Sequence, residues 1–202
     1  VTFDHRVGKV FANLQIGADV AGAKALISNG AVAGRGPQLM GQGFLVSRDH
    51  AEALKSRSSE LSQKHIRPYK NGRDLTANSR ELWVLDLFGL SEEEVKVEFP
   101  QAYQLISDLV RPEREQNNRA AYRERWWQFG ENVHAVRKAL TGLPRYIGTV
   151  YTAKHRVFQF VPEEMIVDAT INIIAIDDAA FLTLLSSTQH VVWSLAAGSR
   201  LG

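Results

Sequence analysis

The sequence predicts an α/β fold of the mixed α+β kind, arranged as a single domain over residues 1–202. Short stretches rich in Val, Ile, Tyr and Phe, which are typical of strands, alternate with stretches that begin at helix-capping residues. The connections between them are short, and the sequence contains no internal repeat, low-complexity tract or interdomain linker. With 202 residues, 45% of them hydrophobic, the chain is long enough to bury a core of its own.

The first quarter of the chain predicts one strand, a set of turns, a second strand and a helix. Apolar and polar residues alternate within residues 1–20, which favours a strand. The stretch "AKALISNGAVAGRGPQLMGQGFLVS" is punctuated by glycine but lacks the Gly-Lys-Ser/Thr of a phosphate loop, so we interpret it as turns. A short strand is expected at 43–47. Asp49 is placed to cap a helix that runs to about Ser58.

The second quarter predicts a turn-rich stretch, a strand and two helices. "HIRPYKNGRDL" at 65–75 contains Pro68 and an Asn-Gly pair, both common in turns. A strand is expected at 81–90. Ser91, followed by three glutamates, is a good helix start because acidic groups suit the positive end of the helix dipole. Pro100 then begins a helix to about residue 110.

A third helix is expected from Pro112 to Gly130. On one continuous helix, Arg119, Arg123 and Trp127 recur every four residues and so share one face. This would be a basic helix.

The last third predicts a helix at 131–140, a β-hairpin at 145–160, a strand at 165–176 and a long helix at 177–198 with an Asp cap. The hairpin sequence, "RYIGTVYTAKHRVFQF", contains two β-like runs joined by a four-residue turn. We expect this hairpin and the basic helix to form one surface of the domain.

Charge is unevenly distributed along the chain. The formal net charge is only +2, but residues 111–156 contain eight arginines and two lysines against four acidic residues. Over the whole chain there are 16 arginines and 8 lysines, and the guanidinium fork suits phosphates and guanine edges. The basic block therefore indicates an anionic partner. A solvated helix face is the alternative interpretation.

The hairpin concentrates cationic and titratable groups at its rim. Arg145 begins the first run, and Lys154, His155 and Arg156 follow one another in the join. A two-stranded ribbon fits the major groove of duplex DNA, where each base pair presents a distinct pattern of donors and acceptors. The alternative is that these side chains bond only to neighbouring carbonyl groups.

The sequence offers little material for catalysis. It has no cysteine, its six histidines form no His-x-x-x-His or His-Glu-x-x-His pair, and there is no Gly-x-Ser-x-Gly elbow. We therefore expect no metal site, no catalytic residue and no enzymatic activity in this fragment. No apolar run is long enough to span a bilayer, and the absence of cysteine suits the cytoplasm.

Six stretches together resemble one protein family, in family order and over essentially all 202 residues. They are "VGKVFANLQIGADV", "IRPYKNGRDL", "LWVLDLFGLSEEE", "RPEREQNNRAAYRERWWQFGE", "LPRYIGTVYTAKHRVFQF" and "LLSSTQHVVWSLAAGSRLG". They look like the target-recognition domain of MmeI-like bacterial DNA methyltransferases, which modify adenine at N6 and combine modification with restriction. The resemblance implies sequence-specific recognition of double-stranded DNA.

The resemblance also implies what lies outside this chain. The family's Asn/Asp-Pro-Pro-Tyr motif and glycine-rich S-adenosylmethionine loop are both absent. The chain starts at Val1 rather than Met, so we expect a fragment whose catalytic domain is N-terminal to it in a longer parent protein. No cofactor is expected here; the parent would use S-adenosylmethionine, and its catalytic domain would be a partner of this one.

Two arguments predict DNA-contact residues: the composition and position of residues in the sequence, and the resemblance to the family. Composition and position predict residues in the turn, the basic helix and the hairpin: Arg67, Lys70, Asn71, Arg73, Arg119, Arg123, Arg145, Tyr151, Lys154, His155 and Arg156. The resemblance adds residues near the strand ahead of the last helix and at the end of that helix: Thr170, Asn172, Ser199, Arg200 and Gly202.

Two alternative functions remain open. One is a module for RNA or single-stranded nucleic acid, which would use exposed aromatic side chains as stacking platforms, whereas Trp and Tyr here lie mostly within apolar patterns. The other is an interdomain docking domain that uses the acidic, apolar C-terminal third. The salt dependence of affinity for duplex DNA distinguishes both from the leading hypothesis.

Overall fold

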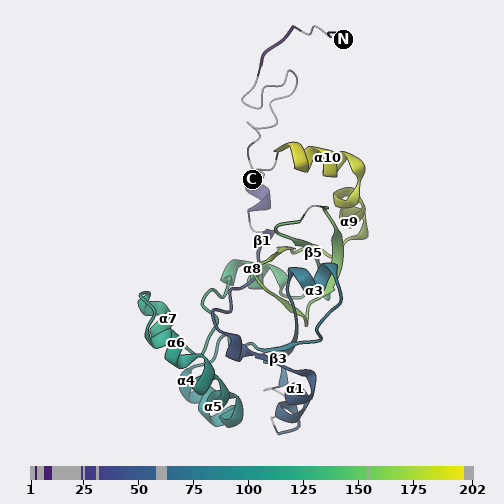
Figure 1. Ribbon diagram of the computed structural model, residues 1–202. Helices are drawn as coiled ribbons and strands as arrows, with labels where there is room; N and C mark the ends of the chain where they lie inside the picture. Colours follow the sequence, from purple (N-terminus) through teal and green to yellow (C-terminus); the bar gives the residue numbers. More distant parts are fainter. Residues whose placement is uncertain are drawn as a thin grey trace. The chain divides into compact units, whose positions relative to one another are not determined.

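The computed structural model describes most of the chain (Figure 1), namely residues 3, 7–10, 24, 26–30, 32–57, 63–153 and 155–197. The chain divides into two compact units, one of residues 31–177 and one that combines residues 1–30 with 178–202. Short strands and short helices alternate along the larger unit. The predicted mixed fold class is therefore confirmed.

The described strands of the larger unit form two four-stranded sheets. The first sheet has the order β1 (Ala33–Arg35), β8 (Ile171–Ile174), β5 (Arg145–Val150) and β6 (Phe158–Pro162), with every neighbouring pair antiparallel. The second has the order β2 (Leu45–Val46), β4 (Trp83–Leu85), β3 (Ile66–Lys70) and β7 (Ile166–Val167). Its last pair, β3 and β7, is parallel. Because β8 follows β7 after three residues, the 168–170 turn connects the two sheets.

Most helices of the larger unit are short. They are α1 (Arg48–Lys55), α3 (Gly72–Thr76), α4 (Glu92–Glu98), α5 (Pro100–Leu109), α6 (Arg111–Glu115), α7 (Ala120–Glu124) and α8 (His134–Leu140), with one turn of 3-10 helix, η2, at Gln42–Phe44. The smaller unit contains the 3-10 turn η1 (Ile27–Asn29), α9 (Ala179–Ser186) and α10 (Thr188–Ala197).

Several predicted helix starts are confirmed. Ser91 and Glu94 form a reciprocal capping box at α4, Pro100 occupies the first turn of α5, and Asp178 caps α9. The start of α1 differs from the prediction, because the hydroxyl of Ser47, and not Asp49, accepts the hydrogen bond from a first-turn amide. The helix ends at Lys55.

The larger unit contains two hydrophobic clusters. The larger cluster packs α1, α4 and α5 against the second sheet and includes Phe44, Val84 and Ile106. The smaller lies on one face of the first sheet and includes Tyr146 and Ile171. The apolar side chains within each cluster hold its sheet and helices together, since burial of apolar area is the main favourable contribution to folding.

The prediction of a continuous helix at 112–130 was wrong. The structure divides it into α6 and α7, with Arg119 in an extended conformation before α7. The side-chain oxygen of Asn117 accepts from the Arg119 amide at 2.9 Å, and such local bonds compete with helix formation. Trp127 lies beyond α7 and donates to the carbonyl oxygen of Leu90 at 3.0 Å. The shared face expected for Arg119, Arg123 and Trp127 therefore does not form.

Two other predicted elements are also divided. The strand expected at 165–176 becomes β7 and β8, because the Asp168 carboxylate accepts from the Thr170 amide at 2.9 Å and closes a turn. The helix expected at 177–198 is interrupted at Ser187, whose hydroxyl accepts from the His190 amide at 3.2 Å and caps α10.

Strand lengths differ from the predictions as well. The turn-rich stretch at 65–75 contains a strand, β3, which the sequence analysis missed. The strand expected at 81–90 is only β4, because Gly89 at φ +86° follows in a turn. The hairpin at 145–160 is confirmed, but its loop runs from 151 to 157 because the Tyr151 amide bonds to the Thr170 carbonyl oxygen instead of across the hairpin. Most of the strand expected in 1–20 lies outside the described residues.

Candidate nucleic-acid interface

An open groove of about 890 Å³ lies in the larger unit, beside the β5–β6 loop. Four segments that are distant in the sequence meet there: the end of β1, the start of α3, the β5–β6 loop and the 168–170 turn. We call this site the hairpin groove. Its lining consists of Arg35, Asn71, Gly72, Arg73, Thr76, Val150, Tyr151, Thr152, Ala153, His155, Val157, Ala169 and Thr170.

A chain of hydrogen bonds holds the base of the hairpin groove together. The hydroxyl of Tyr69 donates to the Asp168 carboxylate at 2.9 Å, and that carboxylate also accepts from the hydroxyl of Thr170. The Thr170 hydroxyl oxygen in turn accepts from the Gly72 amide at 2.7 Å. Burial raises the pKa of the Tyr69 phenol, and the Asp168 charge raises it further, so this phenol remains a donor. The start of α3 is thereby tied to the 168–170 turn.

Two glycines permit the close approach of these segments. A Cβ at Gly36 would lie 2.4 Å from the Asp168 carbonyl oxygen. The Gly36 amide donates to the Ile171 carbonyl oxygen at 3.0 Å. A Cβ at Gly72 would lie 3.1 Å from the hydroxyl of Thr170. Gly36 is part of the glycine-punctuated stretch that we interpreted as turns, and here the glycine serves close packing of backbones.

The start of α3 is a rigid base for Arg73. Asn71 caps the helix by accepting from the amides of Arg73 and Asp74 at 3.0 and 3.1 Å. The buried carboxylate of Asp74 accepts two hydrogen bonds from the Arg80 guanidinium, both at 2.8 Å. This pairing lowers the pKa of Asp74 to about 2. Arg73 itself is exposed, and its side chain makes no hydrogen bond or ion pair within the described part of the chain.

Arg35 is the groove residue that the sequence analysis missed. Its Nε donates to the Ala169 carbonyl oxygen at 3.0 Å, and its guanidinium carbon lies 4.6 Å from the centre of the Tyr151 ring. Tyr151 is half exposed and is fixed through its amide to the Thr170 carbonyl oxygen at 2.8 Å. The signal in the sequence was an arginine between two glycines, Gly34 and Gly36.

The charges of the groove lining have one sign. Arg35 and Arg73 are cationic, and none of the lining residues that the structure describes is Asp or Glu. Hydroxyl groups of Tyr151, Thr152 and other residues add further donors. The groove therefore suits a ligand that is anionic or rich in acceptors.

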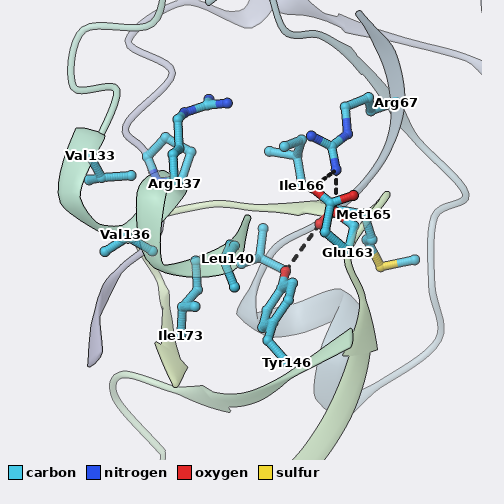
Figure 2. A pocket seen from close by; sticks show the side chains of 12 residues that line it. Arg67, Val133, Val136, Arg137, Leu140, Tyr146, Glu163, Met165, Ile166 and Ile173 are labelled. Carbon is cyan, nitrogen blue, oxygen red and sulfur yellow. Dashed lines mark hydrogen bonds and ion pairs between the residues drawn. The ribbon is translucent and has the colours of Figure 1, made fainter. Parts of the chain in front are cut away.

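The guanidinium of Arg67 bonds to other parts of the fold (Figure 2). Its Nε donates to the Glu164 carbonyl oxygen at 2.8 Å, and another nitrogen bonds to both the carbonyl and the carboxylate of Glu163. Nearby, the Tyr146 hydroxyl donates to the Met165 carbonyl oxygen at 3.0 Å, beside a small cavity of about 90 Å³. The Arg67 guanidinium is occupied by the turn between β6 and β7, so we leave it out of the interface.

Other predicted contact residues lie outside the lining of the groove. Arg145 is paired with Asp177 and stacks 3.7 Å from the centre of the Phe160 ring. Arg119 donates to the hydroxyl of Tyr122 at 2.8 Å. The remaining residues of this group are described but do not line the groove, namely Lys70 at the end of β3, Arg123 in α7, Arg156 in the β5–β6 loop and Asn172 in β8.

The structure thus brings together five of the predicted residues: Asn71, Arg73, Tyr151, His155 and Thr170. In the first sheet, Asn172 lies directly opposite Arg35 on β1 and Thr149 on β5. Four predicted residues lie outside the described residues: Lys154, Ser199, Arg200 and Gly202.

Among the described residues, no group of three or more His, Asp or Glu side chains is arranged to hold a metal ion. No described helix combines the length and apolar character needed to cross a bilayer.

Comparison with known proteins gives a match in structure only. No family model and no curated protein matches this sequence. The fold matches a solved structure of the Type IIL restriction-modification enzyme MmeI in complex with DNA, with a TM-score of 0.71 and 21% identity. The match covers 93% of this chain and 25% of the MmeI chain, so this chain spans about a quarter of that protein. At this identity the two proteins share a fold.

Proposed function

We propose that this chain reads specific sequences in double-stranded DNA, as the target-recognition domain of a site-specific, adenine-N6 DNA methyltransferase of the restriction-modification type. One observation carries the proposal. The hairpin groove gathers Arg35, Arg73 and His155 with hydroxyl donors from four separate segments, and its lining contains no carboxylate. Phosphate oxygens and the acceptor-rich edges of bases are the ligands that such a lining favours.

The shape of the site favours a duplex over a single strand. Because β5 also pairs with β8, the β5–β6 hairpin is part of a four-stranded sheet, and its loop, rather than the two paired strands, would enter the major groove of B-DNA. Sites for single strands stack several successive bases on exposed aromatic rings. Tyr151 is the one aromatic residue in the groove lining, and its exposed ring is already stacked with Arg35.

The comparison supports the same proposal. A protein that shares this fold is a restriction-modification enzyme solved with DNA, and it is about four times as long as the matched segment. Methyl transfer would therefore belong to another part of a longer parent enzyme, which would bind S-adenosylmethionine and act in the cytoplasm. This chain has no Asn/Asp-Pro-Pro-Tyr motif, so it would supply specificity and not chemistry.

Affinity measurements on the 202-residue chain test the proposal. Duplex DNA should bind more tightly than a single strand of the same sequence. If about four phosphates are contacted, affinity should fall on the order of 100-fold between 50 and 200 mM salt. Arg73→Ala with His155→Ala should weaken duplex binding, and the control Arg48→Ala, which removes an exposed side chain of α1, should not. Equal affinity for duplex and single-stranded DNA would contradict the proposal. An affinity for duplex DNA that does not change with salt would contradict it as well.

The C-terminal helices favour a second function alongside DNA recognition, which is docking against the catalytic domain of the same polypeptide. Residues 179–197, which contain α9 and α10, include no Asp, Glu, Lys or Arg. Leu184 and Trp193 are more than half exposed, at 61% and 53%. Exposed apolar patches of this kind mark interaction sites. Leu184→Asp with Trp193→Asp should reduce methylation in the parent enzyme while the isolated chain still binds DNA.

A further inference from the structure

We propose that Arg35 is a specificity-determining residue of the hairpin groove and that the base it reads is guanine. This inference rests on the proposed function, because it concerns how the same groove distinguishes one DNA sequence from another. It assigns a role to a residue outside the basic block of 111–156.

The first support is the way in which the Arg35 fork is held. Its Nε donates to the Ala169 carbonyl oxygen at 3.0 Å, and its guanidinium carbon lies over the Tyr151 ring, 4.6 Å from the ring centre. Arg35 has no carboxylate partner within the described residues, and it is exposed. With Nε occupied, the two terminal nitrogens at the end of the fork are left to donate outward.

The second support is the balance of donors and acceptors in the groove. The side-chain oxygen of Asn71 already accepts from two α3 amides, and the Thr170 hydroxyl oxygen already accepts from Gly72. The lining has no carboxylate to accept from the amino group of cytosine. Guanine presents two acceptors, O6 and N7, in the major groove, and these match the two terminal nitrogens of an arginine fork.

A phosphate contact by Arg35 predicts a different result. Phosphate contacts weaken binding to all sequences alike when they are lost, whereas base contacts change which sequence is preferred. A fork that is anchored at Nε and lies over a ring has fewer orientations than a free side chain, and recognition of a single base edge needs such positioning. Lysine at this position would retain the charge and lose the fork.

The experiment selects ligands for the 202-residue chain from a randomised duplex library and sequences them. The wild-type chain should select a motif that contains guanine. Arg35→Ala and Arg35→Lys should each lose the preference for one guanine by about 10- to 100-fold. Arg35→Lys should keep its affinity for unselected duplexes within about 2-fold, since its charge remains. The matched control, Arg48→Ala, removes an exposed arginine paired with Glu52 and should select the wild-type motif.

Base analogues provide a second measurement that needs no variant. Replacement of that guanine by 7-deazaguanine removes the N7 acceptor and should weaken binding of the wild-type chain, by about 10-fold or more. Replacement by inosine keeps O6 and N7 and removes only the minor-groove amino group, so binding should change little. Urea denaturation of each variant checks that the fold is retained.

Two results would overturn the inference, and they differ in whether the proposed function also fails. If Arg35→Ala lowers affinity for all duplexes equally, or selects the wild-type motif, Arg35 is not a base reader, and the proposed function is unaffected. If the wild-type chain selects no motif and binds single strands as well as duplexes, the proposed function fails and the inference fails with it.

Discussion

Arg114 in α6 and Arg73 in α3 represent two regions of the larger unit that use arginine in opposite ways. Arg114 is 1% exposed, and it donates to the carbonyl oxygens of Leu39, Met40 and Gln128 at 2.8, 2.8 and 3.1 Å. Arg73 is exposed in the hairpin groove, and its side chain has no partner within the described residues. The first connects distant segments of the fold, and the second remains available to a ligand.

The same contrast extends to neighbouring residues of the α6–α8 region. Arg137 makes a double ion pair with the nearly buried Asp86, at 2.7 and 2.9 Å. Arg111 pairs with Glu115 at 2.7 Å. Much of the positive charge in this part of the basic block is therefore neutralised or bonded to backbone. A basic composition indicates an anion-binding surface only if the fold leaves its side chains unpaired.

The largest expected effect is that of Arg114→Ala. The variant leaves three carbonyl oxygens without this donor and opens a cavity at a fully buried side chain, so the free energy of unfolding should fall by about 3–5 kcal/mol. Urea denaturation monitored by tryptophan fluorescence measures the change. The protein that remains folded should bind duplex DNA normally. If the free energy of unfolding is unchanged, Arg114 does not stabilise the fold, and the contrast between Arg114 and Arg73 does not hold.

Gly36→Ala should have the next largest effect, because it acts on the backbone contact beneath the hairpin groove. The new methyl group would meet the Asp168 carbonyl oxygen at 2.4 Å, so β1 and the 168–170 turn would have to separate. We expect a loss of about 2–3 kcal/mol in unfolding free energy together with weaker duplex binding. Gly30→Ala is the control, since its methyl group would lie at an ordinary 3.4 Å from the nearest atom. Equal stability of the two variants would argue against a requirement for close packing at Gly36.

The Asp74–Arg80 pair makes stability depend on pH at the base of the groove. The pKa of Asp74 is lowered from 3.8 to about 2 in the folded chain. Its contribution, about 2 kcal/mol, is therefore complete above pH 4 and is lost as the pH falls through 2. Asp74→Asn should lower stability at pH 7 and flatten the acid limb of the stability curve between pH 4 and pH 2. Denaturation series at several pH values measure both, and an unchanged acid limb would exclude Asp74 as its source.

The smallest change in stability is expected for Arg73→Ala, within about 0.5 kcal/mol, because the side chain has no internal partner. If Arg73 contacts a phosphate, the salt slope of duplex binding should decrease by about 0.9. Fluorescence anisotropy at several salt concentrations measures the slope. Arg111→Ala, which removes an arginine paired with Glu115, is the matched control and should leave the slope unchanged. Identical slopes for the two variants would remove Arg73 from the interface.

Local signals in the sequence predicted the elements that depend on a few neighbouring residues. The capping box at Ser91, the helix start at Pro100 and the hairpin at 145–160 each follow from residues within one or two turns of chain. Such capping and pairing preferences act over short range, so they could be predicted before any tertiary contact was known. Asn71, Arg73, Tyr151, His155 and Thr170 were predicted as contact residues one by one, and that role stays a prediction.

Tertiary structure decided which of those residues share a site. Arg35 and Ala169 are separated by 134 residues and meet because Gly36 lets two backbones approach closely. Arg67 was indistinguishable from Arg73 in the sequence, yet Glu163 and Glu164, about 96 residues away, occupy its guanidinium. The residues next to an arginine in the sequence do not reveal its partner, because pairing depends on which distant segments pack together. Only the folded chain separates arginines that bond to other segments from those whose side chains remain available to a ligand.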